Sequence, residues 1–172
     1  MDSQKYDLLH HPRVQQVLAS SPLLLRKFPP EDFREFLLCG KLEEFNAGET
    51  IVSEKDHFVN DGWLVADGSV SIFKEDVYIA KLHPGDFIGE TFLFKNRAPA
   101  GTLVATRPTA VIRFERENVL SFFENRPDRL FKMFIMNLID LQNQKLIYAG
   151  KKLLYIQRKL AYQTNEDDKL TE

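Results

Sequence analysis

The sequence predicts a mainly β domain that is flanked by helices and followed by one long C-terminal helix. Two observations carry this prediction. Short runs rich in β-branched and aromatic residues, separated by turn residues, fill positions 41–115, and such even spacing is typical of a β-roll, barrel or sandwich. Residues 128–162 contain no proline and only one glycine, Gly150, and their apolar residues recur at helical spacing.

Length and composition limit the classes of function. The chain has 172 residues, of which 44% are hydrophobic and 28% charged, as in an ordinary globular domain with an appended segment. Its formal net charge is -2, whereas a dedicated nucleic-acid binder needs a basic face to neutralise phosphates. We therefore expect no direct DNA binding.

The sequence gives no indication of secretion or membrane insertion. Cys39 is the single cysteine, so no disulfide can form within the chain. The first residues lack the basic-then-apolar pattern of a signal peptide, and no apolar run approaches the length of about 18 residues that a membrane span requires. We therefore expect a cytoplasmic protein without a membrane span.

The N-terminal segment, residues 1–40, is expected to form short helices. Prolines at positions 12, 22, 29 and 30 break it into pieces. The last piece, residues 30–38, places Phe33 and Phe36 on one helical face. A proline pair opens this piece and Gly40 follows it, and these are the residue types favoured at the two ends of a helix.

Residues 41–115 are expected to form the β domain. Turn sequences such as Asp67-Gly68 and Pro84-Gly85-Asp86 separate the apolar runs. The predicted strands are Leu42–Phe45, Thr50–Ser53, Gly62–Ala66, Ser69–Lys74, Val77–Leu82, Leu103–Thr106 and Ala110–Phe114.

Residues 116–165 are expected to be helical in two pieces, with a break near Pro127, and residues 166–172 to form a polar tail. Along the second piece an apolar residue recurs at every seventh position, which is the spacing of a coiled-coil seam. This seam predicts a homodimer formed through the C-terminal helix; the alternative is a helix that packs only on its own domain. The seam residues are Ile139, Leu146, Leu153 and Leu160.

Three stretches of the chain follow one another in a specific order: FNAGETIVSEKD from Phe45, WLVADGSVSIF from Trp63 and IAKLHPGDFIGETFLF from Ile79. Together they resemble the cyclic-nucleotide-binding domain family, which includes bacterial catabolite-activator-like proteins and kinase regulatory subunits. The resemblance covers about residues 20–165. It implies a double-stranded β-helix, the jelly-roll-like β-roll, that is closed by a long helix.

The resemblance assigns ligand roles to Gly89 and Glu90. In the family this pair opens a short helical turn around the cyclic phosphate. The glycine allows close backbone approach, the N–H groups up to Thr91 receive the anion, and the glutamate accepts a hydrogen bond from the ribose 2′-hydroxyl. The alternative is a surface glutamate in an ordinary turn. Three other glycines are expected only to serve tight turns: Gly48, Gly68 and Gly85.

The sequence departs from the family where the phosphate-binding arginine is expected. Counting from Glu90 without a gap puts Pro99 in that place, followed by Ala100, Gly101 and Thr102 in the small-residue positions. Proline carries neither a charge nor an N–H donor, so it contributes nothing to phosphate binding.

Three interpretations of this loop remain open. In the first, the loop bulges and Arg97, two residues before the proline, serves the phosphate. In the second, only the backbone N–H groups of residues 89–91 and 101–102 hold the phosphate. In the third, the pocket is degenerate or binds another molecule. Losing the charge partner of a buried anion typically weakens binding strongly.

The resemblance also points to one position on the long helix. In the family a base contact comes from about seventeen residues after the proline that opens this helix, and counting from Pro127 gives Gln144. An amide side chain could read a base edge with a donor and an acceptor together. The alternative is a solvated helix face.

The sequence therefore predicts a non-catalytic regulatory or sensor module that binds cAMP or cGMP if the pocket is competent, and that acts on a separate effector protein. The alternative is a ligand-independent dimerisation or scaffold module with a degenerate pocket. No helix-turn-helix pattern follows the long helix, which again disfavours direct DNA binding. We expect no catalytic residue, metal or cofactor, because the sequence contains no His-x-His pair, Gly-x-Ser-x-Gly motif or P-loop.

Overall fold

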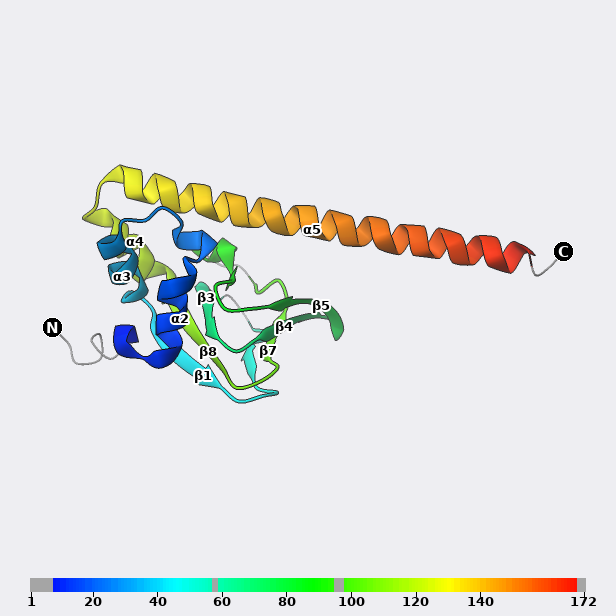
Figure 1. Cartoon of the computed structure of the whole chain (residues 1–172), viewed down its shortest axis with the longest axis horizontal. Helices are drawn as coiled ribbons and strands as arrows, with labels where there is room; N and C mark the ends of the chain where they lie inside the picture. The colour runs from blue at the N-terminus through cyan, green and yellow to red at the C-terminus, as the bar shows by residue number, and fades with distance from the viewer. Residues whose placement is uncertain (1–7, 57–58, 95–97, 170–172) are drawn as a thin grey trace. The chain divides into compact units, whose positions relative to one another are not determined.

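The computed structural model of the protein describes residues 8–56, 59–94 and 98–169, with side chains up to Ala161. The chain forms two compact units, Met1–Asn137 and Leu138–Glu172. The first unit holds every strand and the shorter helices, and the second holds most of the long C-terminal helix (Figure 1).

Among the described residues, the N-terminal segment of the first unit is helical at residues 8–10 and then contains three further short helical elements. Helix α2 spans Pro12–Ser20, the 3-10 helix η1 spans Leu23–Leu25, and helix α3 spans Pro30–Leu37. A proline lies in the first turn of both α2 and α3, where its missing N–H would have no helical partner in any case. The apolar sides of these elements are buried through Val14, Val17, Leu24, Leu25, Phe36 and Leu37.

The β domain consists of eight short antiparallel strands in two four-stranded sheets, counted over the described residues. One sheet has the order β1-β8-β3-β6 and the other the order β2-β7-β4-β5. This arrangement confirms the predicted β-roll. The strands are β1 Lys41–Phe45, β2 Thr50–Val52, β3 Asp61–Asp67, β4 Val70–Lys74, β5 Val77–Leu82, β6 Phe87–Ile88, β7 Thr102–Ala105 and β8 Thr109–Glu115.

Every predicted strand is present, and β6 is the one that the sequence analysis missed. It has only two residues and pairs through Trp63–Ile88 and Leu64–Phe87 with β3. Two residues are too few for an alternating pattern to be recognised. Its position matters because Gly89 follows it directly.

The roll has an apolar interior between its sheets, and the first sheet is also covered on its other face. Strands β3 and β8 are therefore apolar on both faces, and successive side chains point to opposite sides. On the outer face, Phe36 of α3 lies 5.0 Å from Phe114, centroid to centroid. Between the sheets the buried cluster consists of Val52, Trp63, Val65, Val70, Leu82, Leu103 and Val111.

The predicted turn glycines adopt the left-handed conformation. The φ angles are +89° at Gly48 and +93° at both Gly68 and Gly85. At Gly68 a Cβ atom would lie 2.6 Å from the Cα of Thr109, so both the backbone conformation and the available space require glycine there.

Two helices follow the roll. Helix α4 spans Arg116–Glu124 and α5 spans Asp128–Lys169. The first turns of α5 belong to the first unit, where Leu130, Phe134 and Asn137 are buried. The helix continues to Lys169, four residues into the segment that was predicted as a polar tail. No helix in the described part of the chain is both long and apolar enough to cross a membrane.

Candidate functional site

A glycine in the left-handed conformation begins the candidate site. Gly89 follows edge strand β6 with φ +87° and ψ +30°, and it precedes the 3-10 helix η2, Glu90–Leu93. A Cβ atom at this position would lie 2.7 Å from the carbonyl oxygen of Asp61. Only glycine meets both conditions, so the expected Gly-Glu pair does open a short helical turn here.

The first residues of the η2 turn are accessible at the surface of the domain. The carbonyl oxygen of Gly89 accepts a hydrogen bond of 2.8 Å from the N–H of Phe92, which closes the turn. Glu90 is half-buried and Thr91 is exposed. The first N–H groups of a helical turn have no acceptor within that turn, so they suit an anion; their use by a ligand stays a prediction.

An arginine that the sequence analysis did not single out fixes the other end of η2. Arg116, the first residue of α4, donates a 2.8 Å hydrogen bond from Nε to the carbonyl oxygen of Leu93. Its side chain is largely buried. Because the charged guanidinium satisfies the terminal carbonyl of the turn, Arg116 ties the turn to the helical part of the domain.

The second part of the candidate site begins strand β7. Gly101 is buried, and a Cβ atom on it would lie 2.5 Å from the carbonyl oxygen of Phe73. The glycine therefore allows the chain to pass close to β4. The hydroxyl oxygen of Thr102 accepts a 3.2 Å hydrogen bond from the N–H of Glu54. Gly101 thus has a packing role, and the Thr102 hydroxyl already has one partner inside the protein.

The loop between the two parts contains the departure from the family pattern. Ala100 is exposed and Pro99 is half-buried. Arg97, the candidate substitute for the missing arginine, lies outside the described residues. Gly89 to Thr91 follow an edge strand of one sheet, while Gly101 directly precedes β7 of the other sheet and Thr102 begins it. The predicted phosphate contacts therefore come from both sheets of the roll.

An ion pair lies next to Thr102. The Nζ of Lys74 is 2.7 Å from the Glu54 carboxylate, which also accepts a 2.8 Å hydrogen bond from the N–H of Glu75. The hydrogen bond from Lys74, followed by that from Glu75, lowers the pKa of Glu54. The same carboxylate raises the pKa of Lys74. The Lys74 charge is therefore already paired within the protein.

A second group of charged side chains lies on the first sheet and includes Asp61, whose carbonyl oxygen is next to Gly89. Arg113 of β8 lies 2.9 Å from Glu43, 3.3 Å from Asp61 and 3.2 Å from Glu115. Burial raises the pKa of Asp61 in spite of the attraction of Arg113. In Glu115 the hydrogen bond from Lys41 lowers the pKa. These groups pair with one another, which gives them a structural role at the base of the turn.

Gln144 lies on α5 in the second unit and is exposed. Its contact with a base stays a prediction. Among the residues that the structure describes, no group of three or more His, Cys, Asp or Glu side chains could hold a metal ion.

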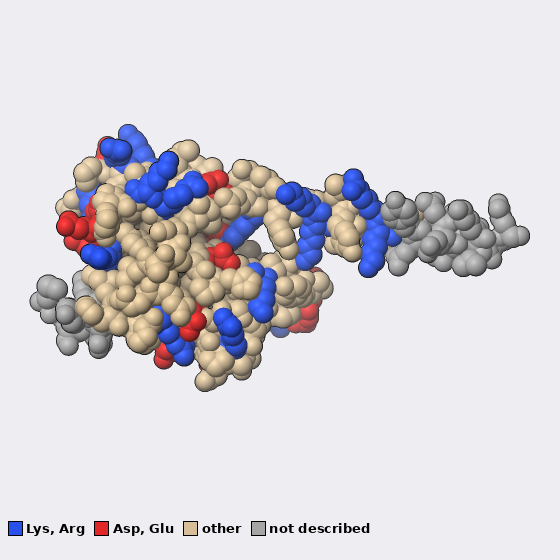
Figure 2. Space-filling view, in the orientation of Figure 1, with Lys and Arg blue, Asp and Glu red and all other residues tan. Residues whose placement is uncertain are grey.

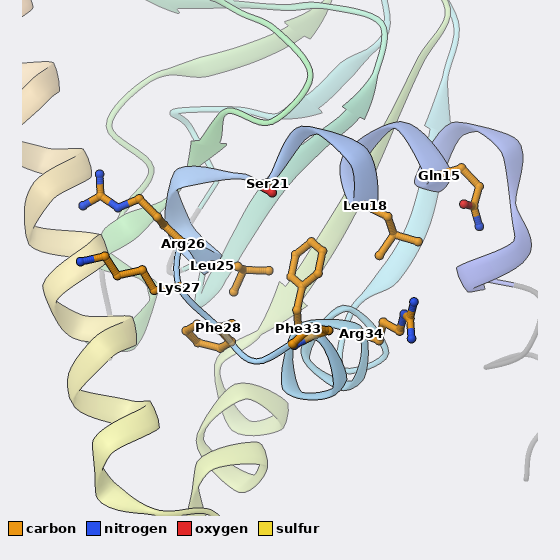
Figure 3. A pocket seen from close by; sticks show the side chains of 10 residues that line it. Gln15, Leu18, Ser21, Leu25, Arg26, Lys27, Phe28, Phe33 and Arg34 are labelled. Atoms are coloured by element: carbon orange, nitrogen blue, oxygen red, sulfur yellow. The ribbon is translucent and has the colours of Figure 1, made fainter.

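A separate hollow of about 510 Å³ lies between the N-terminal helices. Leu18, Leu25 and Phe33 point toward one another at its middle, whereas Arg26 and Lys27 point away from it (Figure 3). None of the predicted ligand residues lines it. Its middle is apolar and its cations do not converge, so it lacks the few convergent polar groups that orient a ligand.

Comparison with known proteins agrees with this geometry. Residues 42–126 match the sequence profile of the family described as "Cyclic nucleotide-binding domain". Comparison with curated protein sequences gives no match.

Solved structures share the fold. The catabolite activator protein of Thermus thermophilus has a TM-score of 0.64 and 24% identity, over 78% of this chain and 63% of that one. A cyclic nucleotide-binding domain from Methylobacillus flagellatus KT has a TM-score of 0.69 and 18% identity, over 83% and 81%. The CBD2 domain of PKAR with Sp-2Cl-cAMPS bound has a TM-score of 0.53 and 22% identity, over 77% and 93%.

The Thermus protein is longer, and this chain spans less than two thirds of its length. The roll, the left-handed Gly89 turn and the sequence match lead to one conclusion: through residues 42–126, the chain belongs to the cyclic nucleotide-binding domain family.

Proposed function

We propose that this protein is a non-catalytic regulatory or sensor module whose ligand is a cyclic nucleotide, cAMP or cGMP. The observation that carries the proposal is the Gly89–Leu93 turn, which a left-handed glycine opens at the edge of the roll in a domain of this family. The first N–H groups of a helical turn have no acceptor within the turn itself, and N–H groups in this position can bind an anion. Glu90 would accept a hydrogen bond from the ribose hydroxyl, and Gln144 would contact the base.

The source of the positive charge decides how tightly the phosphate is held. Pro99 leaves the usual arginine position without a cation, and Lys74 is paired with Glu54. We propose that Arg97 serves the phosphate, with backbone N–H groups of Gly89–Thr91 and Ala100–Thr102 around it. A guanidinium can bind a phosphate through two parallel hydrogen bonds.

Calorimetry with cAMP and cGMP tests the proposal, with AMP and GMP as controls that lack the cyclic phosphate. We expect binding of one cyclic nucleotide, and Arg97→Ala to weaken it by about 10-fold or more, the effect of losing a charged hydrogen bond. Arg129→Ala, which removes an exposed arginine of α5, is the matched control and should bind normally. Unchanged affinity of Arg97→Ala would leave the backbone N–H groups as the phosphate site. No heat at millimolar nucleotide would reject the sensor function.

The signal would leave through the long helix. Its seam residues Ile139, Leu146, Leu153 and Leu160 are all exposed, at 56–73%, and we propose that a second copy of the chain covers them. The homodimer would act on a separate effector protein in the cytoplasm, where a reducing environment keeps the Cys39 thiol reduced. On the visible face of α5 the basic side chains alternate with uncharged surface (Figure 2), which fits a solvated flank of a seam better than a DNA-binding stripe.

A second function has its own support. The proline in place of the arginine and the exposed seam together favour a ligand-independent dimerisation or scaffold module. The two functions differ in the calorimetric experiment: a scaffold would dimerise and bind neither nucleotide.

A further inference from the structure

Trp63 lies inside the roll, next to the candidate site. It belongs to β3, opposite Ile88 of β6 and Arg113 of β8. Its side chain is 6% exposed and packs in the cluster between the two sheets. Around this cluster lie side chains that are only partly buried, among them Ile51, Ile72 and Ile88. The cluster is therefore bordered by apolar side chains that solvent still reaches in part.

The indole ring touches the turn that begins the candidate site. A Cβ atom on Gly89 would lie 3.3 Å from Cζ3, at the benzene end of the Trp63 ring. This is tight contact, so the glycine also makes room for the tryptophan. The indole nitrogen lies at the opposite end of the ring from Cζ3, so the N–H group is directed away from Gly89.

The indole N–H is buried and has no hydrogen-bond partner among the described residues. A buried tryptophan usually directs this group to an acceptor, because an unsatisfied buried donor costs stability. A phenylalanine would fill much of the same space without a polar atom. The unpaired N–H thus indicates an acceptor that the described protein does not supply.

We infer that Trp63 is a ligand-contacting residue, and that its indole N–H donates a hydrogen bond to an acceptor atom of the nucleotide inside the roll. The inference rests on the proposed function and adds to it a neutral donor on β3, from a ring whose benzene end contacts the Gly89 turn. A donor of this kind distinguishes ligands by the position of their acceptor atoms. A ligand that has no acceptor atom within reach of the indole leaves the N–H unpaired and binds more weakly.

The chain has one tryptophan, so tryptophan emission reports on Trp63 alone when excitation at the red edge of its band avoids the tyrosines. We expect the emission maximum or intensity of the wild-type protein to change with cAMP or cGMP, with the same midpoint as the calorimetric titration. We expect Trp63→Phe to weaken the binding roughly 3- to 10-fold, the range that one hydrogen bond supports.

The matched control is Leu103→Val, which reduces the same apolar cluster without removing a polar atom, and which should leave affinity within about 2-fold. If wild type and Trp63→Phe bind equally in calorimetry, the inference is wrong, because the N–H does not contact the ligand, and the sensor function stands. If Trp63→Phe does not fold, the wild-type emission decides: binding heat without any emission change rejects the contact. If no nucleotide gives heat, the proposed function fails and this contact with it.

Discussion

The side-chain amide of Asn137 in α5 donates a 3.0 Å hydrogen bond to the backbone carbonyl of Leu24 in η1. The same nitrogen lies 2.9 Å from the carbonyl oxygen of Arg26. Asn137 is 4% exposed, so one buried side chain satisfies two carbonyls at the end of a 3-10 helix. It joins segments more than a hundred residues apart, at the last residue of the first unit.

We predict that Asn137→Ala destabilises the protein by about 1–3 kcal/mol, because it removes the donor of the buried hydrogen bond to the Leu24 carbonyl. Urea unfolding measures the change in the free energy of unfolding. Asn143→Ala, in an exposed position of the same helix, is the control and should change stability by no more than about 0.5 kcal/mol. Equal effects of the two substitutions would mean that the bonds to Leu24 and Arg26 add nothing.

Alanine substitutions at three glycines can show how much of the loss in stability comes from backbone conformation and how much from steric contact. Gly150 is helical and has open space around it, so Gly150→Ala should stabilise by about 0.5–1 kcal/mol. Gly48 has φ +89° and open space, so Gly48→Ala should cost about 1–2 kcal/mol. Gly89 combines φ +87° with a contact of 2.7 Å to the Asp61 carbonyl oxygen, and Gly89→Ala should cost more than Gly48→Ala.

Thermal and urea unfolding of the three variants test this order. Amide hydrogen exchange adds a local measurement, since Gly89→Ala should speed exchange in the Gly89–Leu93 turn while Gly48→Ala leaves the turn unchanged. If Gly89→Ala and Gly48→Ala lower the free energy of unfolding equally, the contact of the added Cβ atom with the Asp61 carbonyl oxygen costs no stability.

Asp61 provides a prediction with a defined direction in pH. Burial raises its pKa above the ordinary value of 3.8, so the folded state holds the proton more strongly than the unfolded state. Its contribution to stability is therefore fully present below 3.8 and is lost as the pH rises through the raised pKa. Asp61→Asn cannot ionise, so the stability of wild type relative to Asp61→Asn should fall between acidic and neutral pH. A rise over the same range would mean that the ion pair with Arg113 outweighs burial.

The fold could be predicted from the sequence far better than the site could. Alternation of apolar residues and turn dipeptides is a local signal, and it located all strands except the two-residue β6. The side-chain contacts that fix the site turn and the long helix are not local. Arg116 reaches Leu93, at the end of the site turn, across 23 positions, and Asn137 of the long helix reaches Leu24 across 113. Nothing in the neighbouring residues reveals such partners. Trp63 was read only as part of a motif, because an unpaired N–H can be recognised only when the surrounding atoms are in place.

The seam of α5 provides the last prediction. Leu153 and Leu154 are adjacent leucines of similar exposure, 57% and 48%, but only Leu153 is on the heptad series. In a dimer formed along that series, Leu153→Glu would place two like charges in one apolar interface, whereas Leu154→Glu would place them about 100° further around the helix. We expect the first substitution to raise the dimer dissociation constant by on the order of 100-fold, and the second to change it little. Sedimentation equilibrium over a concentration series measures both constants. A Leu153→Glu protein that dimerises like the wild type would exclude this seam, and loss of the dimer in both variants would place the interface on a broader face of the helix.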